Sequence, residues 1–172
     1  MMEEGKTLVN EAVAAGDDPA DRSFDFVGGG GATALVCEPD PALQEKIGGD
    51  LAALGYRITT PATAKEALKA MRFHVFDVVV VNERFDTEDP EANDVLRYLE
   101  SMAMATRRRF FVALVGAAFR TMDNMAAFNR SVNVVIHLNS IDEIGKIVKQ
   151  GVADNRAFYH VFLETQRKTG KG

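Results

Sequence analysis

Residues 76–85 read FDVVVVNERF, a run of four valines that ends in an asparagine. A continuous β-branched run is typical of a central strand in a parallel sheet, because helices cover both faces of such a strand. The polar residues after the valines indicate that the chain leaves the interior there. We therefore predict a buried strand that ends at Asn82 and places this side chain at the edge of the sheet.

Strand-like and helix-like segments alternate on both sides of this run. Further strands are predicted at ATALVCE (32–38), YRITT (56–60), FFVALVG (110–116) and VNVVIHL (132–138). Helix starts are indicated by Asp40-Pro41, Thr63 with Glu66, Asp89-Pro90 and Ser140 with Glu143, and Met122, Met125 and Ala126 mark a further helix. Five strands, each followed by a helix, predict an α/β fold with a five-stranded parallel sheet. Helices on both faces and right-handed crossovers make it doubly wound.

The first 31 residues differ in composition from the rest of the chain. Their seven acidic and two basic residues account for the whole net charge of −5 of the 172-residue protein. The glycines at 28–31 precede a strand, whereas a phosphate-binding loop follows one, so we interpret them as a linker. We predict an acidic flexible N-terminal tail at 1–31, a domain at 32–150, and a C-terminal helix extension with a basic tail at 151–172.

Composition excludes several classes of function. A neutral body lacks the basic stripe that nucleic-acid binding needs. No apolar run approaches the roughly 20 residues of a membrane helix, and the acidic N-terminus lacks the apolar core of a signal peptide. We therefore expect a cytoplasmic protein that binds neither nucleic acid nor membrane. The single cysteine, Cys37, excludes an internal disulfide and fits a small core residue.

Sites in doubly wound sheets lie beyond the carboxyl ends of the strands. In this chain those positions hold Glu38 and Asp40 after the first strand, Asn82 after the third, Gly116 after the fourth and His137 at the end of the fifth. Glu38 and Asp40 offer the hard oxygen ligands that Mg²⁺ prefers, so weak magnesium binding is conceivable there. Asp40 is equally well explained as a helix N-cap.

Four segments together resemble the strand ends of response-regulator receiver domains: ALVCEPDPALQEKI (34–47), FDVVVVNERF, FVALVGAA (111–118) and VVIHLNSIDEI (134–144). The resemblance covers residues 32 to about 150. It implies a receiver-like, flavodoxin-like three-layer sandwich and a protein partner in a two-component signalling pathway. It also implies a phosphorylation switch, in which paired acids hold magnesium, an aspartate accepts the phosphoryl group, and a hydroxyl residue and a lysine bind it.

The sequence departs from this pattern at most of the switch positions. Glu38 matches one acid, but Asn82 replaces the acceptor aspartate, Gly116 the hydroxyl residue and His137 the lysine. An asparagine amide is neither ionised nor nucleophilic, so it does not support phosphoryl transfer. We interpret the group as a degenerate phosphorylation pocket without catalytic residues. Two interpretations of Asn82 stay open: a relic of a lost reaction that still packs, or a residue that sets one conformation permanently.

Three functions are compatible with these residues. The preferred one is a receiver-like module, not an enzyme, that signals through protein–protein contacts without aspartyl phosphorylation. The second is a response regulator that is phosphorylated, or senses phosphate, by an atypical route. The third is a small-molecule or nucleotide-binding α/β domain, against which the acidic, glycine-free segment CEPDPAL (37–43) argues.

The final helical pattern continues beyond the expected domain, from about Ile141 to about Thr165. Gly151 is a candidate bend within it. The far part of the helix carries a set of apolar side chains that the domain is too short to cover: Phe158, Tyr159, Phe162 and Leu163. Exposed apolar patches mark interfaces, so we expect a contact with a partner or a homodimer there, with folding back onto the domain as the alternative.

Overall fold

The computed structural model describes residues 31–170. Apart from Gly31, the predicted acidic tail lies outside the described residues, and so do the last two residues of the basic tail. Within the part that is described, no helix is both long and apolar enough to cross a membrane.

Five parallel strands form one sheet in the order β2-β1-β3-β4-β5. Their bounds are β1 Thr33–Cys37, β2 Arg57–Thr59, β3 Val78–Asn82, β4 Phe111–Gly116 and β5 Val134–His137. The valine run is the central strand β3, and it is paired with β1 on one side and with β4 on the other. The predicted doubly wound α/β fold is confirmed.

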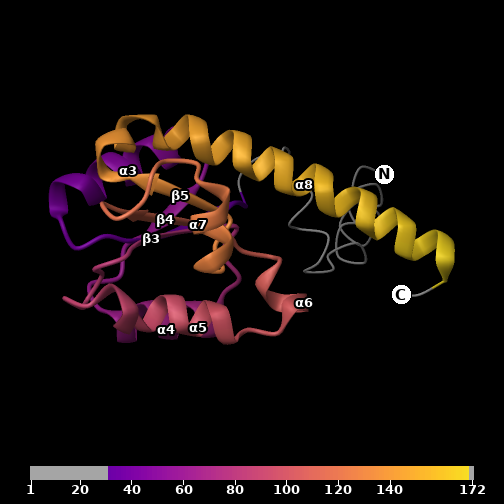
Figure 1. The fold of residues 1–172 in the computed structure, drawn as a ribbon, viewed down its shortest axis with the longest axis horizontal. Helices are drawn as coiled ribbons and strands as arrows, with labels where there is room; N and C mark the ends of the chain where they lie inside the picture. Colours follow the sequence, from indigo (N-terminus) through magenta and orange to yellow (C-terminus); the bar gives the residue numbers. More distant parts are fainter. Residues whose placement is uncertain (1–30, 171–172) are drawn as a thin grey trace, which may run out of the picture.

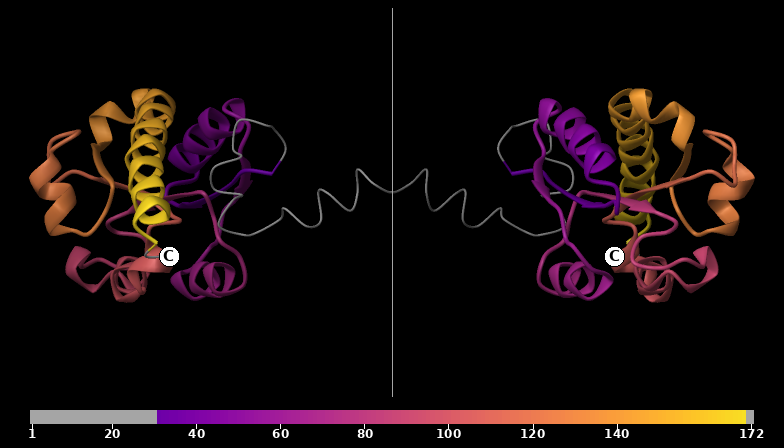
Figure 2. Two further views of the ribbon diagram at one scale, coloured as in Figure 1. Left: turned by 90° about the vertical axis from the view of Figure 1, so that its right-hand side faces the viewer. Right: turned by 90° about the vertical axis from the view of Figure 1, so that its left-hand side faces the viewer.

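Helices connect the strands and cover both faces of the sheet. The α-helices are α3 Pro41–Ala53, α4 Ala64–Phe73, α5 Asp94–Ser101, α6 Met104–Arg107, α7 Asn124–Asn129 and α8 Ile144–Thr169, and two 3₁₀ helices are η2 Pro90–Ala92 and η3 Leu138–Glu143. Figure 1 shows α3 and α8 on one face and α4 and α5 on the other. Viewed along α8, Figure 2 shows α3 and α8 next to each other, and the two helices are in contact.

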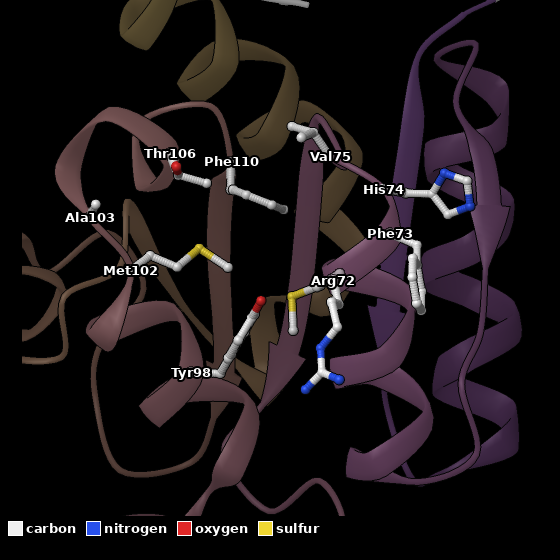
Figure 3. Close-up of a pocket in the computed structure, with 10 residues that line it drawn as sticks. Arg72, Phe73, His74, Val75, Tyr98, Met102, Ala103, Thr106 and Phe110 are labelled. Atoms are coloured by element: carbon white, nitrogen blue, oxygen red, sulfur yellow. The ribbon is translucent and has the colours of Figure 1, made fainter.

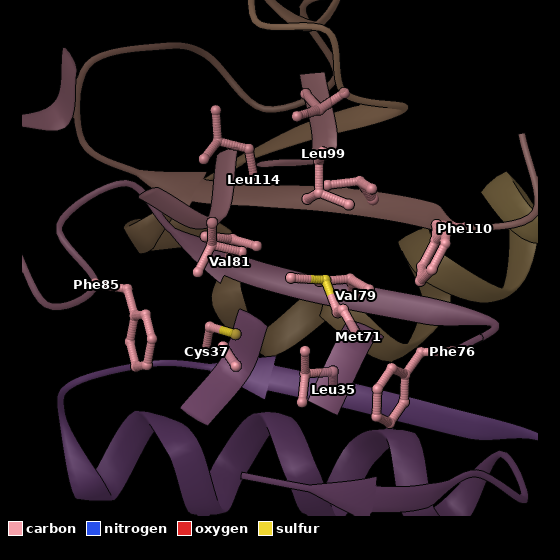
Figure 4. Packing of buried hydrophobic residues seen from close by; sticks show 14 of the residues in the cluster. Leu35, Cys37, Met71, Phe76, Val79, Val81, Phe85, Leu99, Phe110 and Leu114 are labelled. Atoms are coloured by element: carbon pink, nitrogen blue, oxygen red, sulfur yellow. The ribbon is translucent and has the colours of Figure 1, made fainter. Parts of the chain in front are cut away.

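The side chains of β3 point alternately to the two faces of the sheet and contribute to two separate hydrophobic cores. Val79 and Val81 pack with residues of α4, α5 and α7, whereas Val78 and Val80 pack with residues of α3 and α8. Figure 4 shows the first core, in which Cys37 lies among these side chains. Burial raises the pKa of its thiol, as expected for a core residue without a role in chemistry.

Two helices begin later than their sequence signals predict. Asp89-Pro90 opens only the 3₁₀ helix η2, and Asn93 caps α5 by accepting a hydrogen bond from the amide of Leu96 at 3.1 Å. Ser140 lies within η3, and α8 begins at Ile144 without a side-chain cap. Both connections therefore form a short 3₁₀ helix before the α-helix starts, of three residues in η2 and six in η3, a frequent arrangement at helix N-termini.

The helix α8 runs without interruption through Gly151, the candidate bend. A Cβ atom at this position would lie 2.5 Å from Cζ and 3.1 Å from Cε2 of Phe111 in β4. The missing side chain lets α8 approach the sheet closely, with the ring of Phe111 seated against the helix backbone. The sequence pattern correctly marked a special position but not its cause.

Replacing Gly151 with alanine is expected to destabilise the protein. Alanine is favoured in a helix interior by up to about 1 kcal/mol, but overpacking against Phe111 costs about 1–3 kcal/mol, so the net free energy of unfolding should fall. Gly49 in α3 is the matched control, because a Cβ there meets nothing within 4 Å. Gly49→Ala should raise the free energy of unfolding by about 0.5–1 kcal/mol. Urea unfolding of both variants tests this, and equal stabilisation would contradict the proposed close contact.

Candidate functional site

The carboxyl ends of the parallel strands bring the predicted site residues to one edge of the sheet. Asn82 ends β3, and Glu38 follows β1, whose last residue Cys37 pairs with Val81. Gly116 ends β4 and pairs with His137, which ends β5. The topology thus places these residues next to one another, although they are up to about a hundred positions apart in the chain.

Glu38 and Asn82 form a buried hydrogen-bonded pair. The Asn82 Nδ2 group donates to Glu38 Oε2 at 2.8 Å. Glu38 is only 2% exposed and Asn82 only 7% exposed. The other carboxylate oxygen, Oε1, accepts from the backbone amide of Asp40 at 3.2 Å. Both oxygens of the Glu38 carboxylate are therefore engaged inside the protein.

The orientation of the Asn82 amide is set by two different partners. Its nitrogen faces the carboxylate of Glu38, and its oxygen accepts from the backbone amide of Arg84 at 2.9 Å. Only an amide can serve both partners, because a carboxylate at this position would have no proton to donate to Glu38. Asn82 thus links the ends of β1 and β3 as a neutral donor.

Asp40 belongs to the same segment but serves the helix. Its Oδ1 accepts from the amide of Ala42 at 2.9 Å, so the predicted N-cap of α3 is present. Within residues 31–170, no three His, Cys, Asp or Glu side chains come together as a metal site requires. With Asp40 used as a cap and both Glu38 oxygens bonded internally, these residues do not fit a magnesium centre.

His137 reaches the correct edge of the sheet but turns toward its own connection. The imidazole Nδ1 accepts from the amide of Asn139 at 2.9 Å and so caps η3, and its backbone amide donates to Thr121 Oγ1 at 2.9 Å. No hydrogen bond or ion pair in the described chain joins the imidazole to Glu38 or Asn82. The His137 imidazole therefore acts as a cap of η3, while its backbone lies beside Gly116 in the sheet.

Gly116 is covered by a residue that the sequence analysis did not single out, Glu83. A Cβ at position 116 would collide with the Glu83 carboxyl group, lying 2.6 Å from Oε1 and 2.8 Å from Cγ. Glu83 is 3% exposed, and its Oε1 accepts from the amide of Ala117 at 3.3 Å. The absence of a side chain at Gly116 thus provides the space that this buried carboxylate occupies.

The charge of Glu83 is balanced by Arg130, which follows α7. Arg130 Nη2 lies 3.6 Å from Glu83 Oε2, and Nη1 lies 3.0 Å from Glu91 Oε1. Asn93 supports the same loop by donating to the backbone carbonyl oxygens of Asn82 and Glu83 at 3.1 and 3.0 Å. The edge of the sheet therefore holds a polar network that connects β3, η2, α5 and α7.

Sequence signals for this network were weak. Asn93 directly precedes an amphipathic helical segment, which is an N-cap signal, and Glu83 follows the valine run next to Asn82. Arg130 lies 39 positions from Glu91 and has no distinctive sequence context. Only the tertiary fold shows that these charges meet.

A hollow lies at the opposite, amino end of the sheet, and none of the candidate residues lines it. It has a volume of about 270 Å³, and Figure 3 shows Met102, Tyr98 and Phe110 among the side chains that line it. Its lining mixes apolar side chains with polar ones such as Arg72 and His74, and it includes no acidic residue. We therefore place the candidate site at the carboxyl edge and not in this hollow.

Burial of Glu38 predicts a pH dependence of stability. Desolvation raises the pKa of Glu38 above its ordinary value of 4.5, and the hydrogen bonds from Asn82 and Asp40 offset this only in part. Glu38 therefore keeps its proton to a higher pH in the folded protein than in the unfolded chain. The free energy of unfolding should consequently fall as the pH rises through the window that starts near 4.5, by up to about 1.4 kcal/mol per pH unit of that window.

Glu38→Gln should remove this part of the pH dependence, because glutamine does not titrate. Urea unfolding of the wild type and the variant between about pH 4 and 7 measures it. Asp77 also has a pKa raised by burial, so some slope should remain in the variant, and Asp77→Asn should remove that remainder independently. An unchanged pH profile in Glu38→Gln would contradict the assignment.

Comparisons with known proteins identify the fold. No family model matches the sequence, and no curated protein matches it either. Among solved structures, the receiver domain of a Francisella response regulator is 20% identical, with 72% of this chain and 98% of that chain covered and a TM-score of 0.57. A chemotaxis response regulator of Vibrio cholerae is 15% identical over 70% of this chain and 98% of its own, with a TM-score of 0.55.

A longer match comes from NtrX of Brucella abortus, a structure in complex with ADP. It is 16% identical, covers 82% of this chain and 30% of the NtrX chain, and has a TM-score of 0.61. At identities of 15–20%, these three matches show a shared fold. The described part of the chain has the fold of a response-regulator receiver domain.

Proposed function

We propose that this protein is a receiver-like signalling module that acts through protein–protein contacts without aspartyl phosphorylation. The observation that carries the proposal is the hydrogen bond from the Asn82 amide to the Glu38 carboxylate, formed where the resemblance implies the phosphate acceptor. The fold, and the response-regulator descriptions of the similar structures, support the signalling part of the proposal.

The chemistry of the site supports the absence of phosphoryl transfer. Transfer needs an ionised nucleophile in line with phosphorus and cations that stabilise the developing charge. Asn82 presents N–H groups to Glu38 instead of an oxygen nucleophile, and Glu38 is buried with both oxygens bonded. His137, at the position of the cationic lysine, accepts a hydrogen bond within its own turn. The acceptor, hydroxyl and lysine positions of the implied switch are thus held by Asn82, Gly116 and His137, which do not supply those groups.

Phosphorylation of the wild-type chain is the direct test. Intact mass should show no added phosphoryl group after incubation with Mg²⁺ and acetyl phosphate, and amide NMR peaks of Glu38, Asn82 and His137 should not respond saturably to beryllofluoride. Asn82→Asp is the matched variant, because it restores an acceptor carboxylate and places it against Glu38. That repulsion should lower the free energy of unfolding by about 2 kcal/mol or more. A phosphorylated wild-type chain would contradict the proposal and favour a switch by an atypical route.

The far part of α8 is the surface that we propose for the protein contact. Phe158, Val161 and Phe162 lie at i, i+3 and i+4 and are 69%, 63% and 42% exposed, so they share one outward face. Tyr159 stacks edge-to-face on Phe158 and Phe162, with ring centroids 5.3 and 6.5 Å apart. Leu163 is half-buried and continues the helix beside them.

This aromatic face is suited to a second copy of the same helix. Exposed aromatic clusters on a helix commonly mark interfaces, and a symmetric dimer lets the same face cover itself. The boundary predicted at 150/151 falls inside the continuous α8, so the face is attached directly to the domain. The match of NtrX to 82% of this chain exceeds the share matched by the two other structures, and it supports a shared element beyond the core domain.

Removing the aromatic face should dissociate the proposed dimer. Sedimentation equilibrium of the wild type should give a dimer, and the double variant Phe158→Ser/Phe162→Ser should give a monomer whose domain stays folded. Phe128→Ser is the matched control, because Phe128 is a similarly exposed phenylalanine on α7. A monomeric wild type, or an equal loss of the dimer in the control, would contradict this interface.

A further inference from the structure

Glu83 is a buried carboxylate for which the proposed function has no use. Its side chain is 4% exposed and lies between β3, β4 and the residues after α7. A buried charge is costly unless its environment is arranged to bind it. The groups around Glu83 therefore indicate which kind of ligand can bind at this position.

Three features of the surroundings bind an anion. The amide of Ala117 donates to Oε1 at 3.3 Å, and the guanidinium of Arg130 lies 3.6 Å from Oε2. Gly116 has no side chain, and a Cβ atom there would collide with the carboxyl group. A backbone amide, an arginine and a glycine that lets the ligand approach the backbone are the elements of an oxyanion-binding site.

The Glu83 carboxylate is only partly satisfied in this site. Glu83 Oε2 is buried but receives no hydrogen bond from the described residues, because the Arg130 nitrogen is too distant for one. Arg130 also divides its charge, since Nη1 pairs with the exposed Glu91 at 3.0 Å. An oxyanion that is not tethered to β3 is free to approach the Arg130 guanidinium more closely than Glu83 Oε2 does, while it still accepts from the Ala117 amide.

Arg130 connects this site to α7, because it lies at the C-terminal end of that helix. This helix has only six residues, and Ala127 is its one buried residue, whereas Met125 and Phe128 on it are exposed. Its apolar contacts with the core come from Ala127 and the partly buried Ala126, and the link from Arg130 to Glu83 and Glu91 ties its C-terminal end to β3 and η2. The occupant of the anion site thus helps to determine where α7 lies.

We propose that the Glu83 carboxylate is the built-in ligand of an oxyanion-binding site formed by the Ala117 amide, Arg130 and the bare backbone of Gly116, and that it holds α7 in one fixed position. The ligand class of the site, once emptied, is an inorganic oxyanion such as phosphate. The proposal deepens the proposed function and rests on it, because a permanent internal anion sets one conformation without a phosphoryl group.

Removing the Glu83 carboxylate should allow inorganic phosphate to bind at the Ala117 amide and Arg130. In Glu83→Ala, the NMR peak of the Ala117 amide should move saturably with inorganic phosphate, and amide hydrogen exchange of residues 124–129 should be faster than in the wild type. Phosphate should restore the protection of these amides. The wild type should bind phosphate at this amide at least about tenfold more weakly, a difference worth about 1.4 kcal/mol. No phosphate response in a folded Glu83→Ala protein would overturn the anion site.

Two matched variants separate this effect from a general change in charge. Glu91→Ala removes the other acidic partner of Arg130 and should leave the site closed to phosphate. Glu83→Ala/Arg130→Ala should lose the phosphate response that Glu83→Ala gains. A response in Glu91→Ala equal to that in Glu83→Ala, or one that survives the loss of Arg130, would overturn the assignment.

Glu83→Gln covers the case in which the alanine variant fails to fold. It keeps the shape and the acceptor oxygen for Ala117 but loses the charge, so α7 should exchange faster and phosphate should not restore protection. Unchanged exchange in this variant would overturn the link to α7. These outcomes concern reversible anion binding in variants, whereas the proposed function fails only if the wild type becomes covalently phosphorylated.

Discussion

Burial of β3 on both faces is the constraint on which the architecture depends. Val78 and Val80 require an apolar layer on one side, and Val79 and Val81 require another on the opposite side. A strand of this kind cannot lie at an edge or face water, so the chain must place helices on both faces and neighbours on both sides. The same constraint directs every strand's carboxyl end to one edge, and there the polar residues have to find partners within the protein.

The partners found at that edge explain why the residues after the valines are an amide and an acid. Asn82 joins β1 to β3 through Glu38, and Glu83 joins β4 to the end of α7 through Ala117 and Arg130. Consecutive residues on an extended chain point in opposite directions, so this pair serves both sides of the strand end. The edge is consequently a set of internal polar contacts, in which each buried acid has a donor or a cation beside it.

Local signals were sufficient for the strands and most of the α-helices, but not for the short helices α6, η2 and η3 or for these contacts. The valine run, the Asp40 and Thr63 caps and the order of strands and helices were predictable, because periodicity and capping act over a few residues. Glu38 and Asn82 were assigned to one site because strand ends meet in this fold. Glu83 was missed because its role depends on the empty space at Gly116, and Arg130 because its partners come from distant segments. His137 was placed at the correct edge, but its side chain satisfies its own turn.

The close seating of Gly151 on Phe111 gives α8 the mechanics of a lever arm. The helix is fixed to the sheet at this contact and continues for 18 residues beyond it to Thr169, a length of about 27 Å at 1.5 Å per residue. A tilt of about 5° at the contact therefore displaces the far end by about 2 Å. Phe158 and Phe162 lie about 10 and 16 Å along the helix from the contact, so the same tilt moves them by about 1 and 1.4 Å, and the shift of the exposed face grows with distance from the sheet.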